Sequence, residues 1–205
     1  TVVPVDASGD KNVALWIAKL DASRYQPVAD FLATEAARHG VALSPTAAEI
    51  RMAKPILEVP PEEPEDLTNR LQIAAWSLKL RWWSWRASRR HAFPSSTVKV
   101  YVLYEKDHGQ VPEESLGIKQ GRIGIVRTLA GEGESSWTNV IVAHELLHTL
   151  GAKDKYHPNG QPMFPEGYAD PKLLPLVPQR FAEIMAGQIP LEQDGAFVQA
   201  RSLNT

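Results

Sequence analysis

The segment from Trp137 to Leu150 constrains this chain more than any other, because it joins a helical pattern to three polar residues. Gly151 predicts the end of the helix, and Ser136 or Thr138 is expected as its N-cap. Most of its side chains are apolar, so we expect the helix to be buried on nearly all sides. Polar groups buried there without partners would cost several kcal/mol, and a bound cation would remove that conflict.

The polar residues of this helix are His144, Glu145 and His148, which form an HExxH motif. Residues four apart lie on one face of a helix, so both imidazoles can bind one metal ion while Glu145 contacts a water beside it. The bare motif arises by chance at roughly the few-per-cent level in a chain of this length. Evidence for a metal site must therefore come from the residues that follow the motif.

The residues after the motif offer candidates for a third ligand. Gly151 can adopt a positive φ and turn the chain back beneath the helix, which lets Asp154 reach the same ion. Aspartate is a good oxygen ligand for zinc, and the pattern becomes HExxHxxGxxD. The chain has no cysteine, so only His, Asp or Glu can hold a metal. Three rivals to Asp154 remain, namely Glu166, Glu183 and His157.

This extended pattern resembles the metzincin clan of zinc endopeptidases, and Asp154 followed by Tyr156 is similar to its snapalysin-like members. The stretch 182–187 resembles the Met-turn of the clan, with Met185 beneath the metal. The resemblance covers residues from Trp137 to about Pro190. It implies one catalytic Zn²⁺, held by His144, His148 and Asp154.

The resemblance also implies an α+β, metzincin-like fold in a single domain. A mixed twisted sheet with helices would form an N-terminal lobe over about 1–151, which ends with the active-site helix. A small irregular C-terminal lobe would cover about 152–205. An edge strand of the sheet, made by Leu116, Gly117, Ile118 and Lys119, would lie along the cleft and pair with an extended substrate.

Some members of the clan place a tyrosine two residues after the methionine, where it supports the oxyanion. That position is Gly187 in this chain. The role would therefore pass to Tyr156 or Tyr168, or stay vacant.

The expected activity is peptide-bond hydrolysis, with a zinc-activated water in the fourth ligand position and Glu145 as general base. The resemblance implies an endopeptidase. The substrate would be a peptide or a protein. We expect no nucleic-acid partner, because the net charge of −2 gives no attractive field. The alternative is a non-catalytic zinc-binding module whose Trp- and Arg-rich helix binds a partner or the cell envelope.

The rest of the chain predicts strands mixed with helices. Strands are expected over 12–20, 96–104, 116–119 and 122–129. Helices are expected over 24–39 and 67–90, with a short one near 179–185. The segment 41–59 is ambiguous, and solvated loops are expected over 60–67 and 131–136.

The helix expected over 67–90 contains the sequence KLRWWSWRASRR. It is apolar on most sides, which favours a buried helix whose arginines stack on its aromatic rings. The alternative is a cationic, aromatic surface for a membrane or single-stranded nucleic acid, so direct membrane contact stays open. The chain begins at Thr1 rather than Met, which favours a processed, extracytoplasmic protein.

Overall fold

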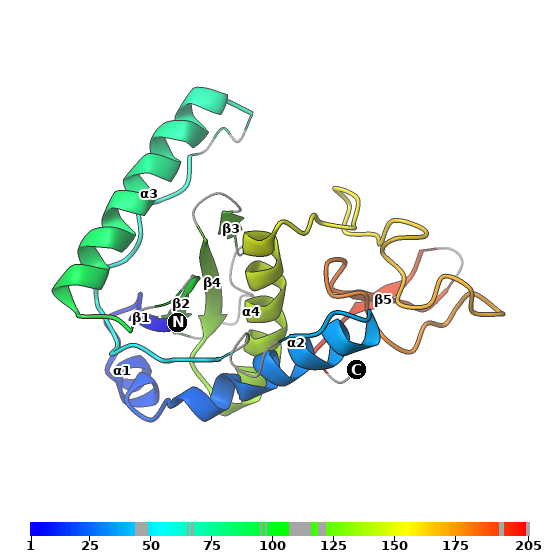
Figure 1. The fold of residues 1–205 in the computed structure, drawn as a ribbon, viewed down its shortest axis with the longest axis horizontal. Helices are drawn as coiled ribbons and strands as arrows, with labels where there is room; N and C mark the ends of the chain where they lie inside the picture. The colour runs from blue at the N-terminus through cyan, green and yellow to red at the C-terminus, as the bar shows by residue number, and fades with distance from the viewer. Residues whose placement is uncertain are drawn as a thin grey trace.

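The fold is built on a four-stranded sheet in the order β1-β2-β4-β3 (Figure 1). These strands are β1 (Val2–Asp6), β2 (Lys99–Glu105), β3 (Leu116–Ile118) and β4 (Ile123–Leu129). Strands β1, β2 and β4 run parallel, and β3 pairs antiparallel with β4 at the edge. The computed structural model describes residues 1–43, 49–64, 66, 68–94, 96, 98–106, 116–118, 122–192 and 195–203.

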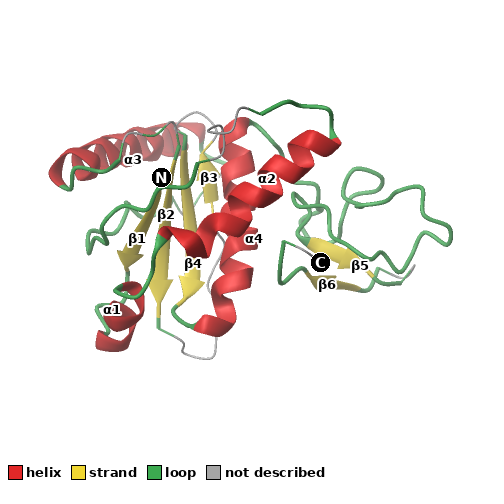
Figure 2. Ribbon diagram, turned by 60° about the horizontal axis from the view of Figure 1, so that its bottom comes forward, coloured by secondary structure: helices red, strands yellow, loops and turns green. Residues whose placement is uncertain are grey.

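Helices cover both faces of this sheet, as Figure 2 shows. They are α1 (Lys11–Ile17), α2 (Gln26–Arg38), α3 (Arg70–Arg90) and α4 (Ser135–Leu150), with short 3₁₀ turns at Ala22–Tyr25 and Glu132–Glu134. Helices α1, α2 and α4 pack on one face, and α3 packs on the other. Beyond α4 the chain is mostly irregular, and a small hairpin pairs β5 (Gln188–Pro190) with β6 (Phe197–Gln199).

The central strand β2 shows why both faces are covered. Val100, Val102 and Tyr104 point into the core beneath α1, α2 and α4. Tyr101 and Leu103 alternate with them and point into the core beneath α3. A parallel strand buried on both faces reads as a continuous apolar run, as this one does. The chain is therefore a mixed α and β protein.

Several sequence predictions are confirmed. The strands expected over 96–104, 116–119 and 122–129 correspond to β2, β3 and β4, and the helix expected over 24–39 corresponds to α2. The zinc-motif helix is α4, and it ends at Gly151 as expected. Neither expected residue caps its N-terminus, however, because α4 begins at Ser135 and Glu134 occupies the cap position without a side-chain bond.

The strand predicted over 12–20 is wrong, because this segment forms α1. Val13 and Ile17 are four residues apart, and both are buried on one side of the helix. Asp10 caps it by accepting a 2.7 Å hydrogen bond from the Asn12 backbone. The first strand lies upstream at β1, on the edge of the sheet, where Pro4 is tolerated.

Other predictions also need correction. The short helix expected near 179–185 is a run of bends and turns. The loop expected over 131–136 holds a 3₁₀ turn and the start of α4. In the described part of 41–59 only isolated bridges form, joining Met52 to Val2 and Ile56 to Val5.

Helix α3 was expected to be buried on most sides, and this prediction is wrong. Trp76, Leu80 and Ala87 are buried, whereas Trp82 and Trp85 are more than half exposed. The expected stacking of arginines on aromatic rings is confirmed at Trp82 and Trp85. Among the described residues, no helix is both long enough and apolar enough to cross a membrane.

Candidate metal centre

Helix α4 brings His144 and His148 together on one face. Their Nε2 atoms lie 3.0 Å apart. A group able to hold a metal ion comprises His144, Glu145 and His148, with one ligand atom from each lying within 4.8 Å of the others. The two histidines, four residues apart, therefore lie on one face of the helix, as the helical pattern predicts.

The turn after α4 carries Asp154 to the same two nitrogens. Gly151 has φ 107°, a left-handed conformation that favours glycine and ends the helix. The Asp154 Oδ1 atom then lies 3.2 Å from His144 Nε2 and 3.0 Å from His148 Nε2. Three ligand atoms from His144, His148 and Asp154 therefore form a triangle of nearly equal sides.

The size of this triangle suits a tetrahedral ion. Ligand bonds of about 2.0–2.1 Å place neighbouring tetrahedral ligands about 3.3 Å apart. The observed sides of 3.0–3.2 Å are close to that value. Two imidazoles and one carboxylate also make a donor set that binds zinc well, whereas calcium and magnesium prefer oxygen ligands.

The other nitrogen of each ring fixes which atom is free to bind. His144 Nδ1 lies 2.9 Å from the Ile184 carbonyl oxygen, and His148 Nδ1 lies 3.1 Å from the Ala152 carbonyl oxygen. A carbonyl can only accept a hydrogen bond, so each Nδ1 carries the proton and donates. In the neutral rings both Nε2 lone pairs then face the Asp154 carboxylate. A cation among them, either a proton or a metal ion, would remove the repulsion between these lone pairs.

The pKa shifts of His144 and Asp154 also indicate that the site attracts positive charge. Burial lowers the pKa of His144, but hydrogen bonds to Asp154 and to the Ile184 carbonyl outweigh this effect and hold that pKa above its usual value. The pKa of Asp154 is lowered, first by its hydrogen bond with His144 and also by the charge of His148. The Asp154 side chain is 43% exposed, so the site is reachable from solvent. These side chains together attract positive charge.

Glu145 is the buried carboxylate of the site and is only 2% exposed. Its Oε2 atom has no hydrogen-bond partner among the described residues. Burial raises the pKa of Glu145 to about 8, and the negative charges of Asp154 and Glu63 add to this effect. A polar oxygen left without a partner at this depth is costly unless a ligand or water reaches it.

Two residues around Glu145 were missed by sequence reasoning. Gly124 on β4 lies directly beneath it, so a β-carbon at Gly124 would stand 3.4 Å from the β-carbon of Glu145. Glu63 comes from the segment before α3, and its negative charge acts on Glu145. This segment was expected to be a solvated loop. A glycine inside an apolar strand was the signal for a close approach, whereas nothing in the sequence singled out Glu63.

The segment expected to resemble a Met-turn forms a tight turn against His144. The Glu183 carbonyl accepts hydrogen bonds from the Ala186 and Gly187 amides at 3.0 and 2.9 Å. Met185 is buried, and its carbonyl accepts a 3.0 Å bond from the Lys155 amide, next to Asp154. The turn thus supports both the His144 ring, through Ile184, and the Asp154 segment.

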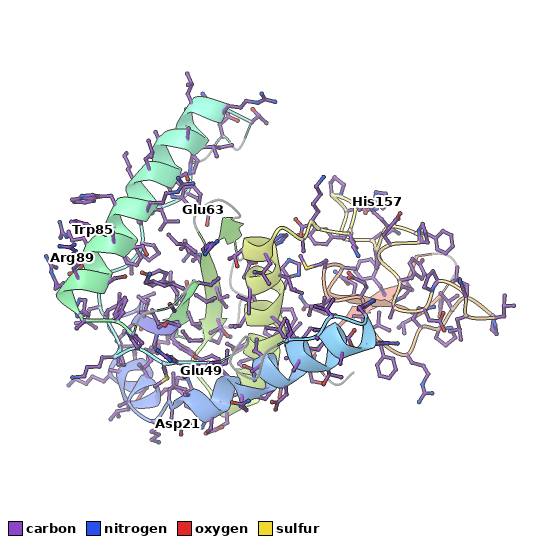
Figure 3. The ribbon with its side chains drawn as sticks, in the orientation of Figure 1. Asp21, Glu49, Glu63, Trp85, Arg89 and His157 are labelled. Atoms are coloured by element: carbon purple, nitrogen blue, oxygen red, sulfur yellow. The ribbon has the colours of Figure 1, made fainter. Side chains whose placement is uncertain are left out.

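The rival third ligands lie elsewhere. Glu183 Oε2 accepts bonds from the Met185 and Ala186 amides, and its Oε1 pairs with Lys155. Glu166 is exposed. His157 is exposed as well and lies out in the irregular segment, away from α4 (Figure 3). Of the candidates, the structure brings only Asp154 to the two Nε2 atoms.

The two tyrosines differ in position. Tyr156 forms a side-chain hydrogen bond that lowers the pKa of Asp154, so it adjoins the ligand triangle. Tyr168 instead packs on Phe164, with ring centroids 5.4 Å apart, and forms a bridge with Ala182.

Strand β3 is the edge strand that the sequence suggested over 116–119. It lies against α4 as well as β4. Lys119 is outside the described residues. One side of β3 carries β4, and no described strand pairs with its other side.

The chain was compared with known protein families, curated proteins and solved structures, and none of them matches it.

Proposed function

We propose that this protein is a zinc-dependent peptidase, with His144, His148 and Asp154 as metal ligands. The observation that carries the proposal is the convergence of three acceptor atoms at 3.0–3.2 Å beside a buried carboxylate, whose Oε2 atom has no hydrogen-bond partner in the described part of the chain. A purely structural zinc site needs neither an accessible position nor a carboxylate beside the ligands. This chain has both.

A zinc ion bound there would supply Lewis acidity that polarises a peptide carbonyl and acidifies water. Glu145 would accept a proton from that water and deliver it to the leaving amine. The raised pKa suits the second step, because protonated Glu145 can keep its proton near neutral pH until the amine leaves. A bound dication would lower this pKa and favour the carboxylate that the first step needs. Gly124 leaves space for Glu145 beneath the helix, and the Ile184 and Ala152 carbonyls keep both histidines in the binding tautomer.

A metzincin-like architecture is part of this proposal. It is supported by the antiparallel edge strand before the last strand, the helix that carries the motif, the glycine turn, and the turn around Met185. An extended substrate would add to the free side of β3 by backbone hydrogen bonds. This geometry favours an endopeptidase, because a strand added along an edge can continue in both directions.

The test measures zinc content and peptide cleavage on the same preparations. The wild-type protein should bind one zinc and cleave a quenched-fluorescent peptide library. Glu145→Gln should keep its zinc and lose activity by a factor of about 10² or more, because it removes the proton acceptor but no ligand. His144→Ala should lose both zinc and activity.

Glu166→Gln is the matched control, because it also neutralises one carboxylate but lies at the surface. Its zinc content and activity should equal those of the wild type. Full activity in Glu145→Gln would contradict the mechanism. A zinc-loaded wild type that cleaves no peptide would favour the alternative, a non-catalytic zinc module.

A further inference from the structure

Helix α3 carries a second apolar face on the side away from the sheet. Leu78, Trp82 and Trp85 follow Leu71 by 7, 11 and 14 residues, so the four side chains form one line along the helix. They are 83% (Leu71), 65% (Leu78), 58% (Trp82) and 53% (Trp85) exposed. We call these four residues the outer stripe. Figure 3 shows Trp85 on the outer side of α3.

The outer stripe lies opposite the face that holds α3 on the protein. Trp76 and Leu80 pack against the sheet, and they are about half a turn around the helix from the stripe. Folding therefore accounts for only one of the two apolar faces. A line of large apolar side chains left in water along a helix marks an interaction surface.

The charge of α3 indicates the chemistry of the partner. The helix contains six basic residues and no acidic one. Because the whole chain carries −2, the residues outside α3 carry −8. Five of the six, Arg70, Lys79, Arg86, Arg89 and Arg90, are exposed. Arg90 pairs with Glu58. In the part of the chain that the structure describes, no carboxylate forms an ion pair with the other four.

Two of these cations sit on the exposed indoles. The Arg86 guanidinium lies 5.2 Å from the Trp82 ring centroid, and that of Arg89 lies 4.8 Å from the Trp85 ring centroid. Each pair joins an apolar ring to a fixed positive charge. Tryptophan and arginine suit the boundary between acyl chains and headgroups, because the ring enters the apolar layer while the guanidinium binds phosphate.

We propose that the outer stripe of α3 docks this protein on the surface of an anionic phospholipid bilayer. An amphipathic helix with leucine and tryptophan on one line and cations beside it is the pattern of interfacial membrane binding. A second copy of the chain is a poor occupant, since two such helices would face each other with like charge. Single-stranded nucleic acid would use the indoles but leave Leu71 and Leu78 in water.

The test is co-sedimentation of the whole protein with vesicles. Phosphatidylcholine/phosphatidylglycerol vesicles should bind the protein, and pure phosphatidylcholine vesicles should bind it at least about tenfold more weakly. Binding should weaken as NaCl is raised, because salt screens the cations. Tryptophan emission should shift to shorter wavelength when the anionic vesicles are added.

Two double variants separate the apolar and charged contributions. Trp82→Ser/Trp85→Ser and Arg86→Gln/Arg89→Gln should each reduce the partition coefficient by about tenfold or more. The tryptophan variant should also lose the emission shift. All four side chains are exposed, so circular dichroism and thermal melting should show that both variants keep the fold.

Matched controls lie on other parts of the surface. Lys54→Gln/Lys172→Gln removes two exposed cations, and Leu174→Ser removes a leucine that is 92% exposed. Both should bind vesicles like the wild type. The proposal is overturned if the wild type ignores anionic vesicles at low salt, or if the controls lose as much binding as the α3 variants. It is also overturned if the stripe variants abolish self-association or oligonucleotide binding and leave vesicle binding unchanged.

Discussion

Asp154 differs from the two histidines in how it reaches the candidate metal centre. The histidines are held by a helix, whereas Asp154 is placed by a single left-handed glycine and by the bond between the Lys155 amide and the Met185 carbonyl. Its carboxylate is exposed on one side and hydrogen-bonded on the other. Its position therefore depends on backbone bonds that close the turn around it.

Replacement of Asp154 by alanine should weaken zinc binding strongly. Loss of an outer hydrogen-bond partner of a metal ligand already costs about 10–100-fold in affinity, so loss of the ligand itself should exceed 100-fold. Competition with a chromogenic chelator measures this affinity.

Glu166→Ala is the control for Asp154→Ala, because it removes a rival carboxylate that lies at the surface. Its zinc affinity should stay within about twofold of the wild type, as expected of a surface substitution away from the site. If Glu166→Ala lost zinc while Asp154→Ala retained it, the assignment of the third ligand would be wrong.

The residues of the centre differ in how far sequence could predict them. His144 and His148 follow from helical spacing, because residues four apart lie on one face, and Glu145 follows from the HExxH motif. Asp154 needs one more element, a glycine that reverses the chain, and the sequence shows that glycine. The charge of Glu63 acts on Glu145 through tertiary folding alone, and no local rule connects residue 63 with residue 145.

At the scale of elements, α3 shows that periodicity does not say how many faces of a helix are covered. Its sequence is apolar on most sides, and burial was the natural expectation. The protein has one sheet face for it, so only the line through Trp76, Leu80 and Ala87 is buried. Helix α1 was predicted wrongly for another reason, because its segment was expected to be a strand. Its short apolar run suited a strand or a helix equally, and the cap at Asp10 favours the helix.

Two leucines of α3, one buried and one exposed, allow a matched test of this arrangement. Leu80 is 0% exposed, so Leu80→Ala should lower the free energy of unfolding by about 2–5 kcal/mol, through lost burial and the cavity left behind. Leu78→Ala, on the outer stripe, should change it by no more than about 0.5 kcal/mol. Denaturant titration measures both values. Equal effects would mean that α3 does not pack on the sheet as described.

At the scale of the whole molecule, the centre joins two parts of different construction. Sheet and helices up to α4 rest on two apolar cores. Much of the chain after Gly151 is irregular and depends on turns, short bridges and the β5–β6 hairpin. The sequence predicted the first part better, because apolar periodicity marks strands and helices but leaves no trace in irregular backbone. Residues 144 and 154 lie on either side of this boundary.

A metal ion bound at the centre should therefore stabilise the segment after α4 more than the sheet. Zinc at 100 times its dissociation constant should add about 2.7 kcal/mol to the free energy of unfolding, because it binds only the folded site. Chelation should then raise hydrogen exchange in residues 152–187 and leave β2 and β4 protected. His148→Ala should exchange like the chelated protein and show no response to zinc. Zinc that protected β2 and β4 but not residues 152–187 would contradict a site that ties this segment to α4.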